Sequence, residues 1–402
     1  MKKTIITLAV ALATTAFSQV KIGQQVFLEK YTHLVKGKRI GLITNPTGIA
    51  PDLTPTVDLL YNHPDIDLRI LMAPEHGIRG DLKAGEKFEN MKDLSTGLPV
   101  HTLYGHKDHK PQPDALKEID TIIYDIQDVG SRAYTYIWTL AEAMSAAAAN
   151  NKTVIVFDRP NPLGAKTVDG YVTEKKWLSF IGLYQIPRVY GMTVGELALL
   201  LNKEFNINCH LMVIPMQGYK RDMKWADTGL PWVPASPNIP SVDSAMNFAA
   251  TGTIGTLGNI SIGIGDPLPF SYIAAPWINA EKTAKALNHA RLPGVRFRPI
   301  HLKPYNFAYE GKQIHGVQIH VTDPVKFRPS TTELVMLYHL QNVYPSHFVF
   351  KPEKNNSFDK AMGTSLIRQK LTKRAKLNEI LQLATPGINR FLQQRKKYLL
   401  YR

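Results

Sequence analysis

Five short apolar runs in the first half of the chain constrain its fold more than any other feature. Each lacks the alternation of a half-exposed strand, which predicts strands covered on both faces. The runs are Arg39–Thr44, Leu68–Met72, Thr121–Ile126, Thr153–Phe157 and Leu211–Ile214. Helical patterns lie between them, such as Thr193–Phe205, which begins with the capping-box pattern Thr-x-x-Glu. This alternation predicts an α/β fold, a parallel sheet wrapped by helices.

The second half of the chain has a different pattern. A proline-dense segment, Pro231–Pro240, looks like a connector, and a glycine-rich stretch follows at Thr251–Phe270. Helix and strand patterns then mix, at Ala280–Ala290, Val295–Ile300, Val317–Val321, Thr331–Tyr344 and Asn378–Tyr398. We therefore expect a larger domain over residues 19–240 and a smaller α+β domain over residues 241–402.

Residues 1–18 have the pattern of a secretory signal peptide. Two lysines precede the apolar run Ile5–Phe17, and a small–x–small site, Ala16–Ser18, ends just before Gln19. The apolar run is too short to span a membrane comfortably. We expect a protein exported to the periplasm or secreted, without stable insertion in a membrane.

Charge and cysteine content narrow the possible partners. The formal net charge is +15, and Lys351–Arg402 alone holds 13 Lys and Arg against three acids. An exported protein is a poor match for nucleic acid, which leaves a solvated basic face or, as the alternative, contact with a polyanionic envelope. With Cys209 as the single cysteine, stability must come from a core rather than from disulfides. Nothing in the sequence indicates the oligomeric state.

Polar side chains follow four of the predicted strands directly. They are Asn45 after the first, Glu75 and His76 after the second, Gln127, Asp128 and Arg132 after the third, and Asp158, Arg159 and Asn161 after the fourth. In an open parallel sheet, ligands bind beyond the carboxyl ends of the strands, so these groups mark one candidate site. Taken alone, Asn45 and Arg159 are more typical of turns and structural ion pairs.

Glu75 has the strongest individual signal for function. It stands at the end of an apolar run, between Pro74 and Gly77, which fixes an acid where a strand ends. The adjacent His76 fits either contact with a substrate or a structural hydrogen bond.

Motifs for several other chemistries are missing from the chain. We find no dinucleotide fingerprint, P-loop, nucleophile elbow or His-Glu-x-x-His motif, so we expect no metal or redox cofactor. Four carboxylates remain near the predicted edge: Glu75, Asp125, Asp128 and Asp158. Glycoside hydrolases use carboxylates in a polar cleft. One carboxyl group protonates the leaving oxygen, and a second activates a water molecule or attacks the sugar itself. Aromatic side chains such as Tyr136 would bind sugar rings.

Long motifs then point to a known family. They are Asn45–Gly48, Pro74–Gly80, Ala84–Glu86, Tyr124–Gly130, Tyr134–Tyr136, Asp158–Gly164, Tyr190–Glu196, Thr228–Trp232, Ser236–Pro240, Phe358–Gly363 and Arg395–Tyr401. With these motifs the chain resembles the exo-β-N-acetylmuramidases of the NamZ type over nearly its whole mature length. The resemblance implies a Rossmann-like N-terminal domain, a smaller C-terminal domain and a cleft between them. It also implies release of terminal N-acetylmuramic acid from the non-reducing end of peptidoglycan-derived muropeptides or disaccharides.

The resemblance also suggests roles for individual residues. Glu75 stands where the family's proposed catalytic glutamate stands, with Asp128 or Asp125 as the second group and His76 beside it. We expect the substrate to be bound by Asn45, Gln127, Arg132, Tyr136, Asp158, Arg159, Asn161 and Asn238. Of these, Arg132 and Arg159 could pair with the lactyl carboxylate of muramic acid, because a guanidinium matches both oxygens of a carboxylate.

The glycine-rich stretch departs from the family pattern. Many relatives carry Glu and Arg there, whereas this chain reads Gly255–Asn259 and Gly263–Asp266 without those residues. Specificity could therefore differ. The rival hypothesis is a non-catalytic protein that uses the same cleft to hold glycans of the cell envelope.

Overall fold

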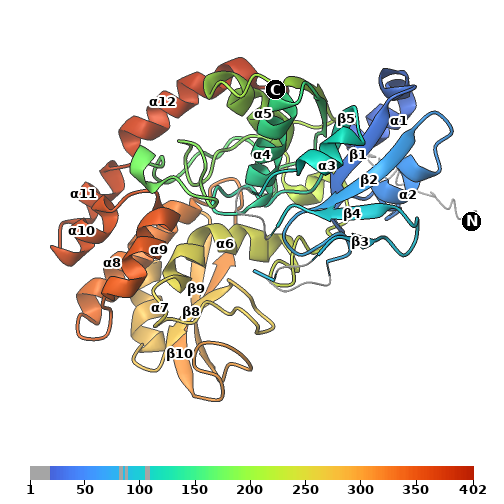
Figure 1. Ribbon diagram of the computed structural model, residues 1–402. Coiled ribbons are helices and arrows are strands. Elements are labelled where there is room, and N and C mark those ends of the chain that lie inside the picture. Colours follow the sequence, from blue (N-terminus) through green and yellow to red (C-terminus); the bar gives the residue numbers. More distant parts are fainter. Residues whose placement is uncertain (1–18, 81–84, 87–88, 105–108) are drawn as a thin grey trace, which may run out of the picture.

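The computed structural model describes residues 19–80, 85–86, 89–104 and 109–402, which form two domains (Figure 1). The expected signal peptide, residues 1–18, lies outside the described residues. Within the described ranges, no helix has the length and apolar character needed to cross a membrane.

The described part of the N-terminal domain is built on a seven-stranded sheet in the order β3-β4-β2-β1-β5-β6-β7. All neighbours pair in parallel except β3, which pairs antiparallel with β4 at one edge. The strands are β1 Arg39–Thr44, β2 Asp67–Ala73, β3 Met91–Lys92, β4 Pro99–Thr102, β5 Thr121–Asp125, β6 Thr153–Phe157 and β7 His210–Ile214. The α/β class and all five predicted strands are confirmed. Strands β3 and β4 were not predicted, because two and four residues give too little pattern.

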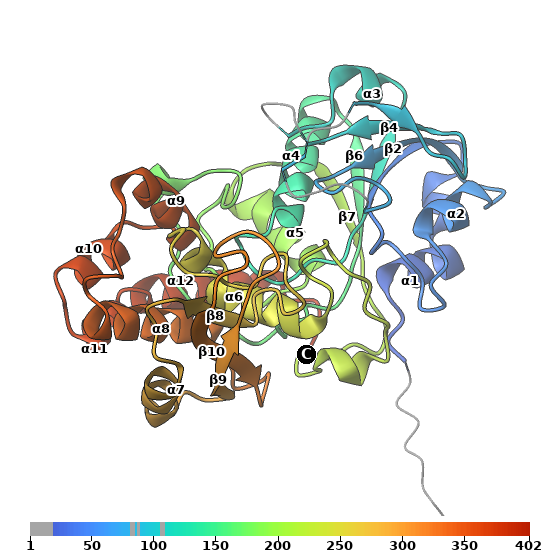
Figure 2. The ribbon, with the colours of Figure 1, turned by 90° about the horizontal axis from the view of Figure 1, so that it is seen from below.

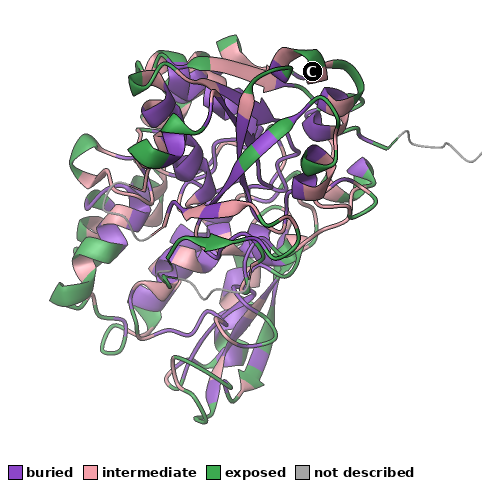
Figure 3. Cartoon of the chain, turned by 45° about the vertical axis from the view of Figure 1, so that its right-hand side comes forward, coloured by how far each residue is buried: buried purple, intermediate pink, exposed green. Residues whose placement is uncertain are grey.

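Helices cover both faces of this sheet, which is why its strands lack alternation. Ile122 and Tyr124 of β5 join one apolar core, while Ile123 between them joins the other. Figure 3 shows buried segments in the interior of the molecule and exposed outer faces on the surrounding helices. The helices are α1 Gly23–Lys30, α2 Thr56–Tyr61, α3 Pro113–Lys117, α4 Tyr136–Ala149 and α5 Val194–Glu204, with the 3-10 helices η1 Thr32–Val35, η2 Lys175–Trp177 and η3 Trp225–Thr228. Thr193 caps α5 in the predicted capping box with Glu196.

The C-terminal domain has a three-stranded antiparallel sheet in the order β8-β10-β9. Its strands are β8 Tyr272–Ala275, β9 Val295–Leu302 and β10 Ile314–Val321. Its helices are α6 Val242–Gly255, α7 Ala280–His289, α8 Pro329–Val343, α9 Pro352–Met362, α10 Leu366–Thr372, α11 Leu377–Gln382 and α12 Thr385–Arg395, followed by the 3-10 helix η4 Lys396–Tyr398. Figure 2 shows α7 lying against this sheet. The single helical pattern at Asn378–Tyr398 is divided into α11, α12 and η4, with Pro386 in the first turn of α12, where proline is tolerated.

The end of the chain returns to the N-terminal domain. The Tyr401 hydroxyl donates a 2.6 Å hydrogen bond to Oδ2 of Asp158, and the Leu400 N–H donates one of 2.8 Å to Oε1 of Glu196. In Figure 1 the C-terminus accordingly lies beside α5 rather than with the C-terminal sheet. The two domains are therefore joined both by the segment before α6 and by this tail.

Candidate active site

A cavity of about 810 Å³ lies between the two domains. Its volume is within the range of pockets that enclose small-molecule ligands. The N-terminal domain and its connector contribute Glu75, His76, Tyr104, Ala133, Tyr134, Thr135, Phe180, Ile181 and Ser236–Ile239. The C-terminal domain contributes Phe248, Ile264, Gly265, Phe270, Asn306 and Phe307. The expected cleft between the domains is thus present, and aromatic and aliphatic side chains make up much of its wall.

A tight turn after β2 presents Glu75 to this cavity. The Gly77 N–H donates a 3.1 Å hydrogen bond to the Pro74 carbonyl, which closes the turn. His76, between them, has a φ of 75°, in the left-handed region that residues other than glycine seldom occupy. Strain of this kind persists where the surrounding structure enforces it, often at functional sites.

The carboxylate of Glu75 is held by donors from two directions. The Thr135 hydroxyl, at the start of α4, donates a 2.9 Å hydrogen bond to Oε2. The Gly85 N–H donates one of 3.1 Å to Oε1. Burial and the nearby charge of Glu75 raise the pKa of Tyr104 to about 12, so this phenol stays protonated at neutral pH. Glu75 is therefore oriented toward the cavity by donors from two separate segments of the chain.

Asp125 and Arg159, expected at the site, instead form a buried ion pair. Arg159 donates to both carboxylate oxygens, at 2.5 Å from Nε and 2.9 Å from Nη2, and Thr56 adds a third hydrogen bond of 2.6 Å. Both charged groups are buried, and neither lines the large cavity. This corrects two expectations: Asp125 is not placed as the second catalytic carboxylate, and Arg159 is not placed to read a lactyl group.

Asp128 is buried, but it lies near a residue of the cavity wall. Its Oδ2 accepts hydrogen bonds from the Tyr190 hydroxyl and, at 2.7 Å, from the Gly130 N–H. Burial raises the pKa of Asp128 to about 6. Burial also raises the pKa of Tyr134, and the negative charges of Glu75 and Asp128 raise it further. Asp128 does not itself line the large cavity, but it lies close enough to interact with a tyrosine that does.

Arg132 is also placed away from the cavity. Its guanidinium donates to the backbone carbonyls of Tyr171 at 2.7 Å, Ile186 at 3.1 Å and Ala361 at 2.8 Å. The side chain is fully buried, and burial lowers its pKa to about 9. Because Ala361 belongs to the C-terminal domain, Arg132 connects the domains, which corrects the expectation that it contacts the substrate.

Asp158 holds together the interior of the N-terminal domain. Besides the Tyr401 hydroxyl, its carboxyl oxygens accept hydrogen bonds from the Thr193 hydroxyl at 2.7 Å and the Gly195 N–H at 2.8 Å. Burial raises the pKa of Asp158 to about 7. Its partners are the start of α5 and the C-terminal tail, so this site, too, is structural rather than exposed to a ligand.

Three further residues expected to bind substrate lie in the interior. They use their polar groups on the chain itself: Asn45 accepts from Thr47, Tyr136 donates to Ala235 and Asn161 donates to Met192. None of the three lines the large cavity, which corrects their expected position. Asn238 does line it, and its Oδ1 accepts a 3.3 Å hydrogen bond from the Gly265 N–H across the domain boundary.

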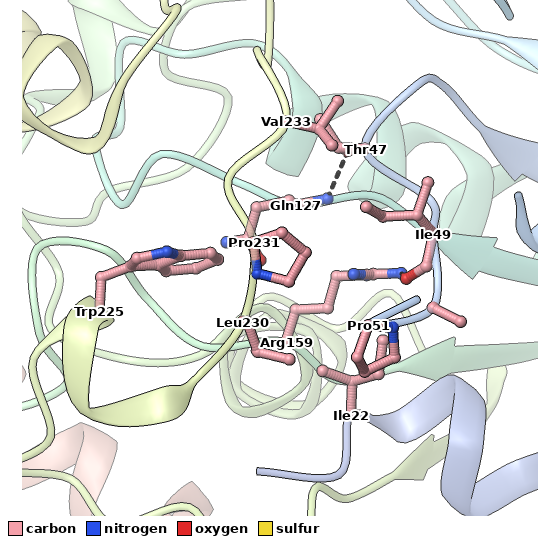
Figure 4. Close-up of a pocket in the computed structure, with 11 residues that line it drawn as sticks. Ile22, Thr47, Ile49, Pro51, Gln127, Arg159, Trp225, Leu230, Pro231 and Val233 are labelled. Atoms are coloured by element: carbon pink, nitrogen blue, oxygen red, sulfur yellow. Dashed lines mark hydrogen bonds between the residues drawn. The ribbon is translucent and has the colours of Figure 1, made fainter. Parts of the chain in front are cut away.

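Gln127 and Arg159 face a separate space of about 20 Å³, shown in Figure 4. It has room for about one water molecule and none for a sugar. Trp225, Leu230 and Pro231 line the same space, beside the hydrogen bond that the Gln127 backbone N–H donates to the Thr47 hydroxyl. The segment that leads into the proline-dense connector therefore fills the central part of the sheet edge. The large cavity therefore lies farther along the same edge of the sheet, beyond the ends of β2 and β4.

Several cavity residues were not predicted as site residues. Thr135 and Tyr134 belong to the Tyr134–Tyr136 motif. The motif marked this segment correctly, but we expected Tyr136 in it to be the residue that binds the substrate. Phe307 and Asn306 lie in the β9–β10 loop, where no periodicity or motif marked them.

Two family models match the chain, described as the N-terminal and C-terminal parts of exo-β-N-acetylmuramidase NamZ, over residues 40–243 and 246–401. A peptidoglycan β-N-acetylmuramidase NamZ of Bacillus subtilis is 45% identical over 384 residues, which is 95% of this chain and 92% of that protein. A crystal structure of a DUF1343 family protein from Bacteroides fragilis matches with a TM-score of 0.90 and 42% identity, over 96% of this chain and 99% of that chain. A second such protein from the same organism matches over the same shares, with a TM-score of 0.77 and 28% identity.

Proposed function

Because the chain belongs to the NamZ family of exo-β-N-acetylmuramidases, and is thus a glycoside hydrolase, we propose that it releases N-acetylmuramic acid from the non-reducing end of peptidoglycan fragments. Family membership decides against the rival hypothesis of a non-catalytic binding protein. The chemistry we propose is acid–base catalysis by carboxyl groups of this chain.

The observation that supports this mechanism best is the placement of Glu75. Among the described residues that line the large cavity, Glu75 is the only carboxylate, and donors from Thr135 and Gly85 orient it. In the proposed reaction Glu75 gives a proton to the glycosidic oxygen as the bond to the anomeric carbon breaks. It recovers a proton from the water that completes hydrolysis.

We propose Asp128 as the second carboxyl group. Its buried side chain has a pKa raised to about 6 by burial, and within the described residues Oδ1 has no hydrogen-bond partner. It lies close to Tyr134, which lines the cavity. When ionised, a carboxylate in this position can stabilise positive charge that develops on the sugar ring, acting through the tyrosine rather than by touching the ring.

The lactyl carboxylate of muramic acid requires a different partner from the two arginines first considered. Among the described residues on the cavity wall, His76 is the only side chain that can carry a positive charge. It is adjacent to Glu75 and is held in a strained conformation. We propose that His76 contacts the lactyl carboxylate, and that the Asn238 amide contributes a further polar contact to the same sugar.

The site of action is proposed from residues 1–18, whose pattern predicts export. The substrates would then be muropeptides or disaccharides outside the cytoplasm, in the periplasm or beyond the cell. Sequencing the N-terminus of the protein purified from the periplasm or medium tests this. We expect a mature chain that begins at Gln19, and an intact Met1 in a cytoplasmic fraction would contradict it.

The activity is tested with two kinds of substrate. A chromogenic β-N-acetylmuraminide should be hydrolysed much faster than the matching β-N-acetylglucosaminide, because the two sugars differ only by the lactyl ether. Glycan chains that end in N-acetylmuramic acid should release that sugar alone, one residue at a time. Release of internal fragments, or equal turnover of both chromogenic substrates, would contradict the proposal.

A further inference from the structure

The loop between β9 and β10, residues 303–313, exposes two aromatic side chains beside the large cavity. Tyr305 is 73% exposed and Phe307 is 70% exposed. Phe307 lines the cavity, whereas Tyr305 does not. Phe307 also has a φ of 60°, in the left-handed region that is unfavourable for a bulky side chain. An exposed aromatic ring on a strained backbone contributes little to folding, which points to a function.

The loop is held firmly in this position. The Tyr305 N–H donates a 2.7 Å hydrogen bond to Oδ1 of Asp266, and the Tyr272 hydroxyl donates to Oδ2 of the same carboxylate. The Asn306 side chain donates a 3.1 Å hydrogen bond to the Gly265 carbonyl. The two residues that precede Phe307 are therefore hydrogen-bonded to the glycine-rich stretch, which fixes the part of the loop that carries its ring.

The ring of Phe307 is supported from behind by the bare backbone of Gly265. A Cβ atom added at Gly265 would lie only 2.6 Å from Cδ2 of Phe307, so any larger residue there would displace the ring. Gly265 itself lines the cavity and has a φ of 79°. One part of the ring thus rests on Gly265, and the rest faces the cavity and solvent, an arrangement suited to stacking.

We propose that Phe307 is the platform for the leaving sugar, the pyranose ring linked to the terminal N-acetylmuramic acid. This rests on the proposed function. An exo-acting enzyme takes the terminal sugar into the enclosed end of its cavity, so the rest of the glycan extends through the mouth. The most buried parts of the wall include His76, Ser236 and Phe270, whereas Phe307 is its most exposed aromatic residue. The apolar face of a pyranose ring stacks on aromatic rings, as in other carbohydrate sites.

The glycine-rich stretch contributes to the same arrangement. Ile264 and Gly265, in the stretch Gly263–Asp266, line the cavity without a charged side chain. A small Gly265 is what permits Phe307 to approach. The C-terminal domain thereby offers an apolar surface to the leaving sugar, and the N-terminal domain supplies Glu75 at the bond between the two sugars.

Binding measurements on a Glu75→Gln background test this, because they separate recognition from hydrolysis. Calorimetric titration is performed with free N-acetylmuramic acid and with the disaccharide that carries N-acetylglucosamine on its reducing side. We expect Phe307→Ala to weaken disaccharide binding about tenfold, the order expected for loss of one aromatic contact, and to leave the monosaccharide unchanged. Phe307→Trp should restore disaccharide affinity. Tyr305→Ala is the matched control, with similar exposure in the same loop but outside the cavity wall, and should change neither affinity.

The outcomes distinguish this inference from the function on which it rests. Unchanged disaccharide affinity in Phe307→Ala, or an equal loss for both sugars, would overturn the leaving-sugar platform while wild-type release of N-acetylmuramic acid kept the proposed function intact. If the Glu75→Gln protein bound neither sugar and the wild type released none, the proposed function and this inference would fall together.

Discussion

The hydroxyl of Thr135 donates a 2.9 Å hydrogen bond to Oε2 of Glu75, which joins the start of α4 to the end of β2. Thr135→Val keeps the branched shape but removes this donor. We expect kcat to fall about tenfold to a hundredfold with KM nearly unchanged, since a hydrogen bond to a charged group contributes about 1.5–3 kcal/mol. Thr135→Ser, which restores the hydroxyl, should recover most of the rate. An unchanged kcat in Thr135→Val would show that this contact does not position Glu75.

His76 should determine the preference for a lactyl-bearing sugar. His76→Asn is the suitable change, because asparagine tolerates the left-handed backbone that His76 adopts. We expect kcat/KM for the chromogenic muraminide to fall about tenfold or more, as for the loss of one charge-assisted contact. Slow turnover of the matching glucosaminide, if measurable, should not fall with it. An equal loss on both substrates would mean that His76 supports Glu75 rather than the lactyl group.

Arg159 should matter for stability and not for specificity. It is buried with Asp125, so Arg159→Ala leaves an unpaired carboxylate in the interior. Breaking a buried pair from one side costs about 3–5 kcal/mol. We expect the free energy of unfolding in urea to drop by about that amount, and Arg159→Met with Asp125→Leu to recover part of it. A loss of muraminide affinity without a change in the free energy of unfolding would instead show that Arg159 contacts the substrate.

Asp158 should make stability depend on pH. Burial raises its pKa to about 7 in the folded state, against about 3.9 in an unfolded chain. The folded protein therefore retains a proton that the unfolded chain releases. The resulting contribution to stability is complete below about pH 4 and is lost as the pH rises through about 7. Asp158→Asn should flatten the decline of unfolding free energy across that window. Asp128, whose pKa is raised to about 6 by burial, should preserve part of the slope.

Unfolding in urea at several pH values from 4 to 8 measures this slope in wild type and Asp158→Asn. The asparagine variant loses an acceptor for the Tyr401 hydroxyl, so its absolute stability also falls. The role of Asp158 is therefore tested by the difference between the two proteins in the slope of unfolding free energy against pH, and not by the difference in their absolute stabilities. Identical slopes would show that Asp158 titrates at the same pH in the folded and unfolded states.

The sequence predicts the sheet well because its strands carry their own signal. Ile122, Ile123 and Tyr124 are apolar in succession because helices cover both faces, and this is visible without coordinates. The capping box of α5 is equally local. Helix α6 was not predicted because its residues overlap the glycine-rich stretch, where burial in the domain overrides low helix propensity.

The site was predictable only in part, for a physical reason. Glu75 was identifiable because Pro74 and Gly77 bracket it. Arg159 and Gln127 follow strands in the same way, yet Trp225 and Pro231, distant in sequence, cover that part of the edge. Which end of a sheet stays open depends on such long-range packing, and no local pattern reports it.

The most direct test of the account is the turnover of a natural disaccharide by Glu75→Gln. Glutamine keeps the shape of the side chain but cannot act as a proton donor of comparable strength. We expect turnover to fall about a hundredfold or more, the usual range for losing a general acid. Glu118→Gln, an exposed change outside the cavity, should retain wild-type turnover as the matched control. A folded Glu75→Gln enzyme that still cleaves the disaccharide at nearly the wild-type rate would remove Glu75 from the chemistry and contradict the proposed mechanism.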